Sequence, residues 1–155
     1  MLVKDLMIEK VFTVEPNDLI DRVFFLIHYE KIRHLPVIEK QKVIGMVSDR
    51  DLYKALGPKS NSNTISGGDA STLHVVSHQV RHIMRRGVLT TSPDAPISEA
   101  CELMAEHKIG ALPVVDSKDK LVGILSTIDL LKVFAKLQKA SEAREQRIAE
   151  GAGQH

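Results

Sequence analysis

The sequence predicts an α+β fold built from two pseudo-symmetric β-α-β-β-α units, and three observations support this prediction. The chain of 155 residues contains one pattern twice, at residues 3–56 and 80–134. Within each copy, short apolar runs typical of strands alternate with segments whose apolar residues recur at helical spacing. One copy alone is too short to bury a large core, so we expect the two units to pack together through their sheets.

The duplication is visible residue by residue. The offset between the copies is 77 as far as Gln41 and Lys118, and 78 after a one-residue insertion at Asp119. Such self-similarity at a fixed offset is the signature of a repeated structural unit. The identical pairs include Met7/Met84, Thr13/Thr90, Pro16/Pro93, Ile32/Ile109, Leu35/Leu112, Pro36/Pro113, Gly45/Gly123, Ser48/Ser126 and Asp51/Asp129.

Each copy predicts the same elements in the same order. An extended segment (residues 11–14 or 88–91) is followed by proline, a polar turn residue and a helix with apolar residues at helical spacing. A strand then begins with a histidine or alanine and the sequence Leu-Pro-Val, where proline is tolerated near the start of a strand. A polar turn, a buried strand and a last helix complete the unit. The predicted helices span residues 18–31 and 96–108, and the later strands 34–39, 43–47, 111–116 and 121–125.

Two segments lie outside the repeats. Residues 57–79 are rich in Gly, Ser and Asn, so we expect a flexible linker, and a loop of this length is either functional or disordered, with disorder favoured here. Residues 135–155 read as a charged helical tail. Its sparse apolar positions either dock on a partner subunit or are solvated; they are Leu137, Ala140, Ala143 and Ile148.

Composition excludes several classes of function. Aromatic residues make up only 4% of the chain and tryptophan is absent, which disfavours stacking platforms for single-stranded nucleic acid. The net charge of +1 disfavours binding to a phosphate backbone, so no nucleic-acid partner is expected. The apolar runs are all too short to cross a membrane, and no targeting segment is visible, so we expect a cytoplasmic protein. The single cysteine, Cys101, excludes an intramolecular disulfide, and its helical spacing favours an apolar face over a catalytic thiol.

The motif Ser-x-x-Asp follows the last predicted strand of both copies, at Ser48–Asp51 and Ser126–Asp129. One interpretation is a capping box, in which the two side chains satisfy each other's backbone donors at a helix start. The other is a ribose site, because an ionised carboxylate accepts hydrogen bonds from two neighbouring hydroxyls. A cap would accept Glu or Gln equally well, so aspartate in both copies favours the ribose site, and both roles can coexist.

Two β-α-β-β-α copies with a Leu-Pro-Val strand and a Gly-h-h-Ser-x-x-Asp turn, where h is apolar, resemble a tandem pair of cystathionine-β-synthase (CBS) domains, the Bateman module. The stretches KIRHLPVIEKQKVIGMVSDRDL and KIGALPVVDSKDKLVGILSTIDLL further resemble the acetoin-utilisation B type of stand-alone CBS pair. The resemblance implies a non-enzymatic homodimer without an obligatory cofactor. Its implied regulatory ligand is AMP, ADP, ATP or S-adenosylmethionine, bound in two clefts between the domains.

The resemblance also implies which residues would line each cleft. Asp129 would meet the ribose and Ser126 the phosphate, with adenine against residues of the first copy, namely Val11, Phe12, Ile32, Arg33, His34 and Pro36. The other cleft would use Ser48 and Asp51 with residues of the second copy, namely Val88, Leu89, Ile109, Gly110, Ala111 and Pro113.

Weaker candidates stay open. Cationic side chains near the motifs either neutralise phosphate or are plain surface charges; they are Lys4, Arg81, Arg33 and Arg50. Helical spacing of His74, His78 and His82 permits a zinc site, but no further ligand is suitably spaced, so solvated histidines are favoured and no metal is expected. Threonines of the first strands either line a cleft or are ordinary strand residues; they are Thr13, Thr90 and Thr91.

The sequence is compatible with three alternative functions. The first is an adenosine-ligand sensor that acts on an unknown effector protein in trans. The second is a ligand-independent CBS-pair dimer that serves as a scaffold. The third, an enzyme, is disfavoured because the sequence offers no paired base and nucleophile, no P-loop and no metal set. Retention of both Asp51 and Asp129 favours the sensor over the scaffold.

Overall fold

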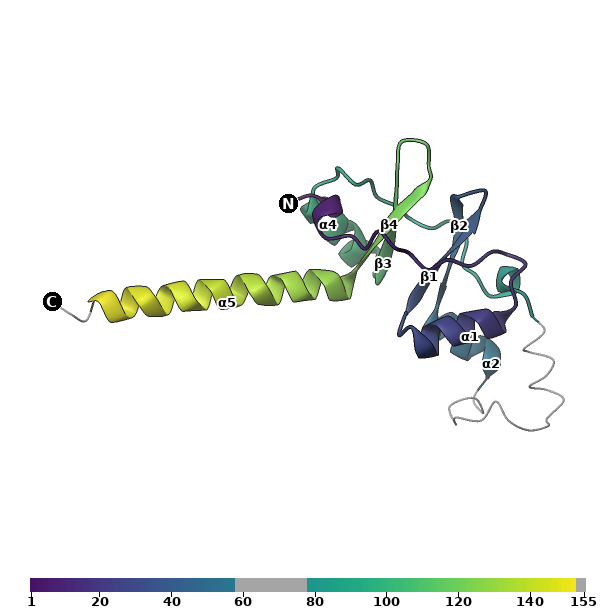
Figure 1. Ribbon diagram of the computed structural model, residues 1–155, viewed down its shortest axis with the longest axis horizontal. Coiled ribbons are helices and arrows are strands. Elements are labelled where there is room, and N and C mark those ends of the chain that lie inside the picture. Colours follow the sequence, from purple (N-terminus) through teal and green to yellow (C-terminus); the bar gives the residue numbers. More distant parts are fainter. Residues whose placement is uncertain (58–77, 153–155) are drawn as a thin grey trace.

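The computed structural model describes residues 1–57 and 78–152, so most of the expected linker and the last three residues lie outside the described residues. The predicted α+β fold with two similar units is confirmed (Figure 1). In chain order the helices and strands are η1 (Val3–Asp5), α1 (Ile20–Tyr29), β1 (His34–Glu39), β2 (Lys42–Ser48), α2 (Asp49–Leu56), η3 (Val80–His82), α4 (Ile97–His107), β3 (Ala111–Val115), β4 (Leu121–Ser126) and α5 (Thr127–Ala152).

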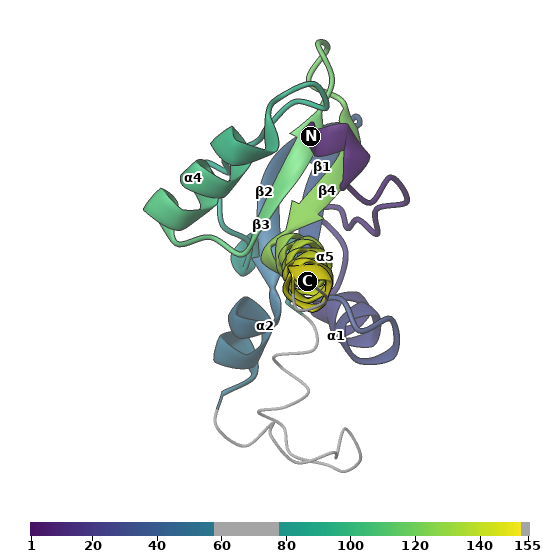
Figure 2. The ribbon, with the colours of Figure 1, turned by 90° about the vertical axis from the view of Figure 1, so that its left-hand side faces the viewer.

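Each unit contains one antiparallel hairpin, β1–β2 or β3–β4, and the two hairpins lie side by side (Figure 2). Lys40 and Gln41 both have positive φ, of 50° and 68°, as a two-residue turn of type I′ requires. The second hairpin has the longer loop, because it holds the inserted Asp119 with φ of 61°. The hairpin tips meet where the amide of Leu121 donates to the carbonyl of Gln41 at 3.1 Å.

The first strands of the two copies are much shorter than the sequence predicts. Val14 forms a single parallel bridge to Val37, and Thr91 forms the equivalent bridge to Val114. A proline follows each bridge residue by two positions, and proline cannot donate to a strand ladder. The pairing therefore does not continue past the bridge, and residues 11–13 and 88–90 before it belong to no strand.

The two cores exchange their opening segments. Val3, from the start of the first copy, is fully buried in the core of the second unit, and its amide donates to the carbonyl of Ala95 at 2.9 Å. Val80, from the start of the second copy, is fully buried in the core of the first unit, where its amide donates to Asp18 at 2.8 Å. The repeat in the sequence and the packed core therefore have different boundaries, and each copy helps to close the other.

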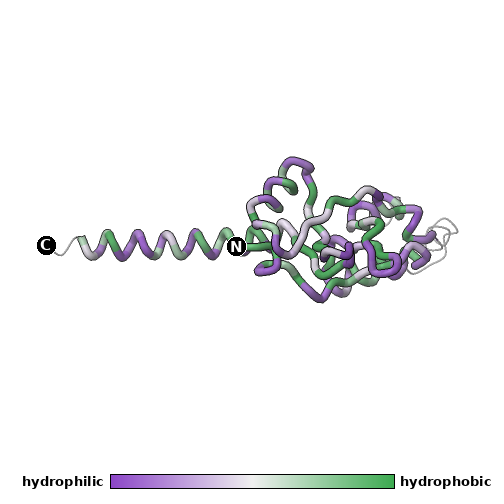
Figure 3. Tube along the Cα trace, turned by 90° about the horizontal axis from the view of Figure 1, so that it is seen from above, coloured by the Kyte–Doolittle hydropathy of each residue, from purple (hydrophilic) through white to green (hydrophobic). Residues whose placement is uncertain are grey.

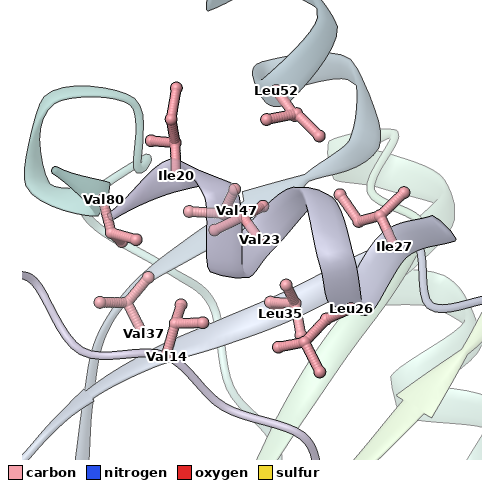
Figure 4. Packing of buried hydrophobic residues seen from close by; sticks show 10 residues of the cluster. All are labelled: Val14, Ile20, Val23, Leu26, Ile27, Leu35, Val37, Val47, Leu52 and Val80. Atoms are coloured by element: carbon pink, nitrogen blue, oxygen red, sulfur yellow. The ribbon is translucent and has the colours of Figure 1, made fainter. Parts of the chain in front are cut away.

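The core of the first unit is assembled from α1, both strands of its hairpin, α2 and η3 (Figure 4). α1 begins at Ile20, two residues later than predicted, because the side chain of Asp18 accepts from the amide of Glu15 at 2.8 Å and stabilises the preceding turn. The residues in this core are Val14, Ile20, Val23, Leu26, Ile27, Leu35, Val37, Val47, Leu52 and Val80.

The last helix, α5, runs without interruption from Thr127 to Ala152 and extends away from the two hairpins (Figure 1). None of its residues is buried. Apolar and polar residues alternate along it (Figure 3), and its exposed large apolar side chains are Ile128, Leu131, Phe134, Leu137 and Ile148. Within the described part of the chain, every helix is too short or too polar to span a lipid bilayer.

Candidate functional site

The Ser48–Asp51 motif lies at the junction of β2 and α2. Oδ2 of Asp51 accepts from the amide and from the hydroxyl of Ser48, both at 2.9 Å. In return, the amide of Asp51 donates to Oγ of Ser48 at 3.3 Å. This is a complete capping box, which satisfies backbone donors that the first turn of a helix leaves without partners.

The Ser126–Asp129 motif has the same geometry between β4 and α5. Oδ2 of Asp129 accepts from the amide of Ser126 at 3.1 Å and from its hydroxyl at 2.5 Å. The amide of Asp129 donates to Oγ of Ser126 at 3.3 Å. The capping interpretation therefore holds in both copies, and it engages one carboxylate oxygen of each aspartate.

The two motifs differ in the hydrogen bonding of the second carboxylate oxygen of the aspartate. Oδ1 of Asp51 accepts from Nε of Arg85 at 3.0 Å. Among the described residues, Oδ1 of Asp129 has no hydrogen-bond partner. The carboxylate of Asp129 thus keeps an acceptor for a further donor, whereas the carboxylate of Asp51 is occupied on both sides.

Asp129 lies beside a cleft of about 360 Å³ at the junction of the two units. The structure brings together seven of the eight residues that the sequence assigns to this cleft, because Pro36 is buried inside β1 and does not line it. The seven are Ser126, Asp129, Val11, Phe12, Ile32, Arg33 and His34. Residues that sequence reasoning did not assign to this cleft also line it, namely Ile8, Lys10, Glu30, Lys31, Gly110, Ala111, Ile124, Thr127 and Ile128.

Asp51 lies beside a larger cleft of about 540 Å³. Here too a proline is the exception, because Pro113 is buried inside β3. The assigned residues that do line the cleft are Ser48, Asp51, Val88, Leu89, Ile109, Gly110 and Ala111. The further lining residues are Arg33, His34, Met46, Asp49, Arg50, Arg85, Arg86, Gly87, His107, Lys108 and Thr127.

His34 stands in the wall that the two clefts share, since it lines both of them. Its imidazole packs so closely on Gly110 that a β-carbon there would lie 3.0 Å from Cε1 of His34. Burial lowers the pKa of His34, and the nearby cation Arg33 acts in the same direction, while Asp49 opposes them. Because burial disfavours its charged form, the imidazole is neutral at neutral pH. It lies packed between the two clefts.

The backbone at the start of β1 and of β3 is tied to the opposite end of the hairpin. The carbonyl of Arg33 accepts from the amide of Asp49, and the carbonyl of Gly110 accepts from the amide of Thr127, each at 3.0 Å. These bonds hold the Leu-Pro-Val segment beside its own Ser-x-x-Asp motif. The segment from the other copy then completes each cleft.

The remaining candidates lie elsewhere. Lys4 forms an exposed ion pair with Asp94 at 2.7 Å, which raises the pKa of the lysine, and it lines neither cleft. Arg81 is exposed and also outside both clefts. Thr13, Thr90 and Thr91 likewise do not line them.

The histidine cluster stays a weak candidate for metal binding. His74 lies outside the described residues. The rings of His78 and His82 meet edge to face with centroids 5.9 Å apart. Within residues 1–57 and 78–152, no group of three potential metal ligands converges.

The residues that sequence reasoning missed carry a signal in the duplication itself. Several of them lie at equivalent positions of the two copies and differ in side-chain chemistry between the copies. Arg85 and Ile8 occupy equivalent positions, three residues before the assigned Val88 and Val11. Listing the positions where the aligned copies differ would have identified both.

Solved structures of CBS pairs share this fold. A putative acetoin utilization protein (AcuB) from Vibrio cholerae is 28% identical, with a TM-score of 0.73 over 92% of this chain and 96% of that one. The CBS domain pair of protein MJ0100, solved with 5′-methylthioadenosine and S-adenosyl-L-methionine, is 26% identical, with a TM-score of 0.72 over 88% and 97%. The structure of CBSX2 in complex with AMP is 25% identical, with a TM-score of 0.70 over 88% and 98%.

Curated relatives are of two kinds. CBS domain-containing protein YhcV of Bacillus subtilis is 33% identical over 128 residues, covering 83% of this chain and 81% of YhcV. A homoserine O-acetyltransferase of Methanococcoides burtonii is 36% identical over 133 residues, covering 85% of this chain but only 24% of the acetyltransferase. This chain thus spans about a quarter of that enzyme's length, and the name of the enzyme says nothing of what this chain does.

The profile of the CBS domain matches the chain twice, over residues 3–58 and 80–136. These two stretches make up more than half of the 155 residues. The chain therefore belongs to the CBS domain family, as a tandem pair of CBS domains.

Proposed function

We propose that this chain is a regulatory module that binds adenosine-containing compounds in its two clefts and acts on a partner protein in trans. The observation that carries the proposal is the carboxylate of Asp129, which is fixed by Ser126 and keeps one oxygen without a partner among the described residues, beside a largely apolar cleft. Solved CBS pairs that hold AMP, S-adenosylmethionine or 5′-methylthioadenosine support the choice of ligand class.

The chemistry of the Asp129 cleft suits a nucleoside. The 2′ and 3′ hydroxyls of a ribose donate to Oδ1 of Asp129, which the capping box holds in place. The base packs between Phe12 and Ile32, which both line the cleft. Apolar walls with a few fixed polar groups are typical of small-molecule sites.

A second candidate is a ligand-independent scaffold, and the two capping boxes favour it. Both Ser-Asp pairs stabilise a helix start by themselves, so the motif has a structural role that needs no ligand. In this case the aspartates would be retained for folding alone.

Either function would use self-association. We infer a homodimer, because α5 presents Leu131, Phe134 and Leu137 on one side, each more than half exposed. These side chains recur every three residues and so follow one face of the helix. Light scattering should then give twice the chain mass of 17.2 kDa, and replacing Leu131 and Phe134 with glutamine should lower it. A monomer at micromolar concentration would contradict the dimer.

A thermal-shift screen tests the proposed function against the scaffold. The compounds are AMP, ADP, ATP, GTP, NADH and S-adenosylmethionine. A ligand at 100 times its dissociation constant raises the free energy of unfolding by about 2.7 kcal/mol, which is a shift of several degrees. The matched control is the double variant Asp51→Asn/Asp129→Asn, because the side-chain oxygen of asparagine can still accept from the amide and hydroxyl of the serine but carries no charge. If no adenosine compound shifts the wild-type protein, the scaffold is correct.

A further inference from the structure

The two clefts differ in charge although they occupy equivalent places in the duplicated fold. Five arginine and lysine side chains against two aspartates line the Asp51 cleft, namely Arg33, Arg50, Arg85, Arg86 and Lys108 against Asp49 and Asp51. Three cations against two acids line the Asp129 cleft, namely Lys10, Lys31 and Arg33 against Glu30 and Asp129. The rest of the Asp129 cleft is mostly aliphatic and aromatic.

One source of the difference is the pair Arg85 and Ile8. Arg85 exchanges two backbone hydrogen bonds with Met46 on β2, at 2.9 and 3.0 Å. Ile8 exchanges the same two bonds with Ile124 on β4, also at 2.9 and 3.0 Å. The backbone places a side chain beside each Ser-x-x-Asp motif in the same way, but one copy supplies a guanidinium and the other supplies a butyl group.

A second source is the pair Arg50 and Ile128, which occupy the second position of α2 and of α5. Arg50 lines the Asp51 cleft, and Ile128 lines the Asp129 cleft. Both are exposed side chains at the rim, so neither is required by the core. Two equivalent positions thus change from cation to isoleucine between the clefts.

The cations of the Asp51 cleft are available to an anion. Among the described residues, the side chains of Arg50, Arg86 and Lys108 form no ion pair with a carboxylate. The side chain of Arg85 is 68% exposed, so its ion pair with Asp51 contributes little and can be exchanged for a phosphate. Arginine binds phosphate through charge-assisted, often bidentate hydrogen bonds. At the two exchanged positions of the Asp129 cleft, an anionic chain would instead meet the apolar side chains of Ile8 and Ile128 and lose solvation there without gaining a cation.

We propose that the two clefts select different adenosine ligands. The Asp51 cleft binds nucleoside di- and triphosphates, with Arg85 moving from Asp51 to the phosphates and freeing Oδ1 for the ribose. The Asp129 cleft binds adenosine compounds whose 5′ substituent is uncharged. This assignment rests on the proposed adenosine-binding function and specifies which compound occupies which cleft.

Reciprocal exchange of the two residue pairs tests the assignment in the full chain. The variant Arg50→Ile/Arg85→Ile gives the Asp51 cleft the residues of its counterpart, and Ile8→Arg/Ile128→Arg does the reverse. Each change installs a residue that the same backbone position already carries in the other copy, and circular dichroism checks the fold. Isothermal titration with ATP and with 5′-methylthioadenosine then measures affinity and stoichiometry for each protein.

We expect one ATP and one 5′-methylthioadenosine for each wild-type chain. Arg50→Ile/Arg85→Ile should lower the affinity for ATP by about tenfold or more and leave the affinity for 5′-methylthioadenosine within about twofold of the wild-type value. Ile8→Arg/Ile128→Arg should lower the affinity for 5′-methylthioadenosine and raise the stoichiometry of ATP binding from one to two molecules for each chain. Two ATP molecules on each wild-type chain, or unchanged ATP affinity after loss of both arginines, would overturn the assignment but leave adenosine binding intact. If neither compound binds the wild type, the proposed function fails as well.

Discussion

The carbonyl oxygen of Arg85 lies so close to Gly45 that a β-carbon at this glycine would be 2.9 Å from it. The second copy repeats the contact, since a β-carbon at Gly123 would lie 2.6 Å from Sδ of Met7. In each case the opening segment of one copy crosses the second strand of the other copy directly over a glycine. This crossing holds the exchanged segments in place and brings Arg85 and Ile8 beside the clefts.

Gly45→Ala should destabilise the protein by about 1–3 kcal/mol, the usual cost of inserting a methyl group into a packed contact. The closest atom is a backbone oxygen held by Met46, so it cannot rotate away as a side chain would. Urea unfolding measures the effect. The control is Gly151→Ala near the end of α5, where a β-carbon meets nothing within 4 Å, and this change should be neutral or slightly stabilising. Equal stability of Gly45→Ala and wild type would show that the crossing is loose.

Asp129→Ala should impair ligand binding far more than folding. The alanine removes the acid half of the capping box of α5 and leaves Ser126 in place, which costs about 1 kcal/mol, or a few degrees in melting temperature. It also removes the acceptor for two ribose hydroxyls, and each hydrogen bond to a charged group is worth about 1.5–3 kcal/mol. Thermal melts and titration with 5′-methylthioadenosine measure the two effects separately.

Asp129→Asn is the matched variant for this prediction. The amide oxygen still accepts from the amide and hydroxyl of Ser126, as Oδ2 of the aspartate does. Stability should therefore stay close to wild type, while ligand affinity falls with the lost charge. If Asp129→Ala melts much earlier but binds normally, the aspartate is only a cap.

The duplicated pattern made the fold predictable, because matched prolines, glycines and Ser-x-x-Asp motifs mark the same elements twice. The exchange of Val3 and Val80 between the cores was not predictable, since each valine fits either core equally well by composition. The length of the first strands was overestimated because residues 11–14 and 88–91 have the pattern of a strand, whereas each forms a single bridge followed by a proline that cannot extend the ladder.

The clefts were predictable only in part. Apolar lining residues follow from the repeat and the family resemblance, and 14 of the 16 assigned residues line a cleft. Pro36 and Pro113 do not, because they are buried within β1 and β3. The ion pair between Arg85 and Asp51 joins residues 34 positions apart, so only the folded crossing reveals it.

His34 should make stability depend on pH. Burial, with help from Arg33 and Arg50, lowers the pKa of His34 in the folded protein, although Asp49 and Asp51 oppose this. The unfolded chain binds this proton near pH 6.5, whereas the folded chain resists it. The contribution of neutral His34 to the free energy of unfolding is therefore fully present above about pH 6.5. It is lost as the pH falls toward the lowered pKa of the folded protein.

The measurement is the free energy of unfolding at pH 7.5 and pH 5.5 for wild type and His34→Asn. The variant should lose less stability on acidification than the wild type, because it has no proton to take up at this site. An identical loss in both proteins would assign the pH dependence to other groups.

Finally, both clefts should prefer adenine to guanine. The carbonyl of Arg33 accepts one hydrogen bond, from the amide of Asp49, and keeps a second acceptor site at the shared wall of the clefts. The carbonyl of Gly110 accepts from the amide of Thr127 at 3.0 Å and from its hydroxyl at 3.4 Å, and this longer bond can be exchanged for one to a base because the hydroxyl rotates. The 6-amino group of adenine can donate to such a carbonyl, whereas O6 of guanine is itself an acceptor. An unsatisfied polar group in a desolvated site costs about 1–3 kcal/mol, enough for a tenfold preference.

Thermal shifts with ATP, GTP and ITP at one concentration measure this preference in the Asp51 cleft, and adenosine compared with guanosine and inosine measures it in the Asp129 cleft. If ATP is present at 100 times its dissociation constant, it adds about 2.7 kcal/mol of stability, and a nucleotide that binds tenfold more weakly adds about 1.4 kcal/mol. ITP has the O6 of guanine without its 2-amino group, so it should behave like GTP if the wall carbonyls read position 6. If ITP gives the same thermal shift as ATP, the clefts instead discriminate against the 2-amino group of guanine. Equal shifts from all three would mean that the clefts read only ribose and phosphate, because the base then makes no selective hydrogen bond.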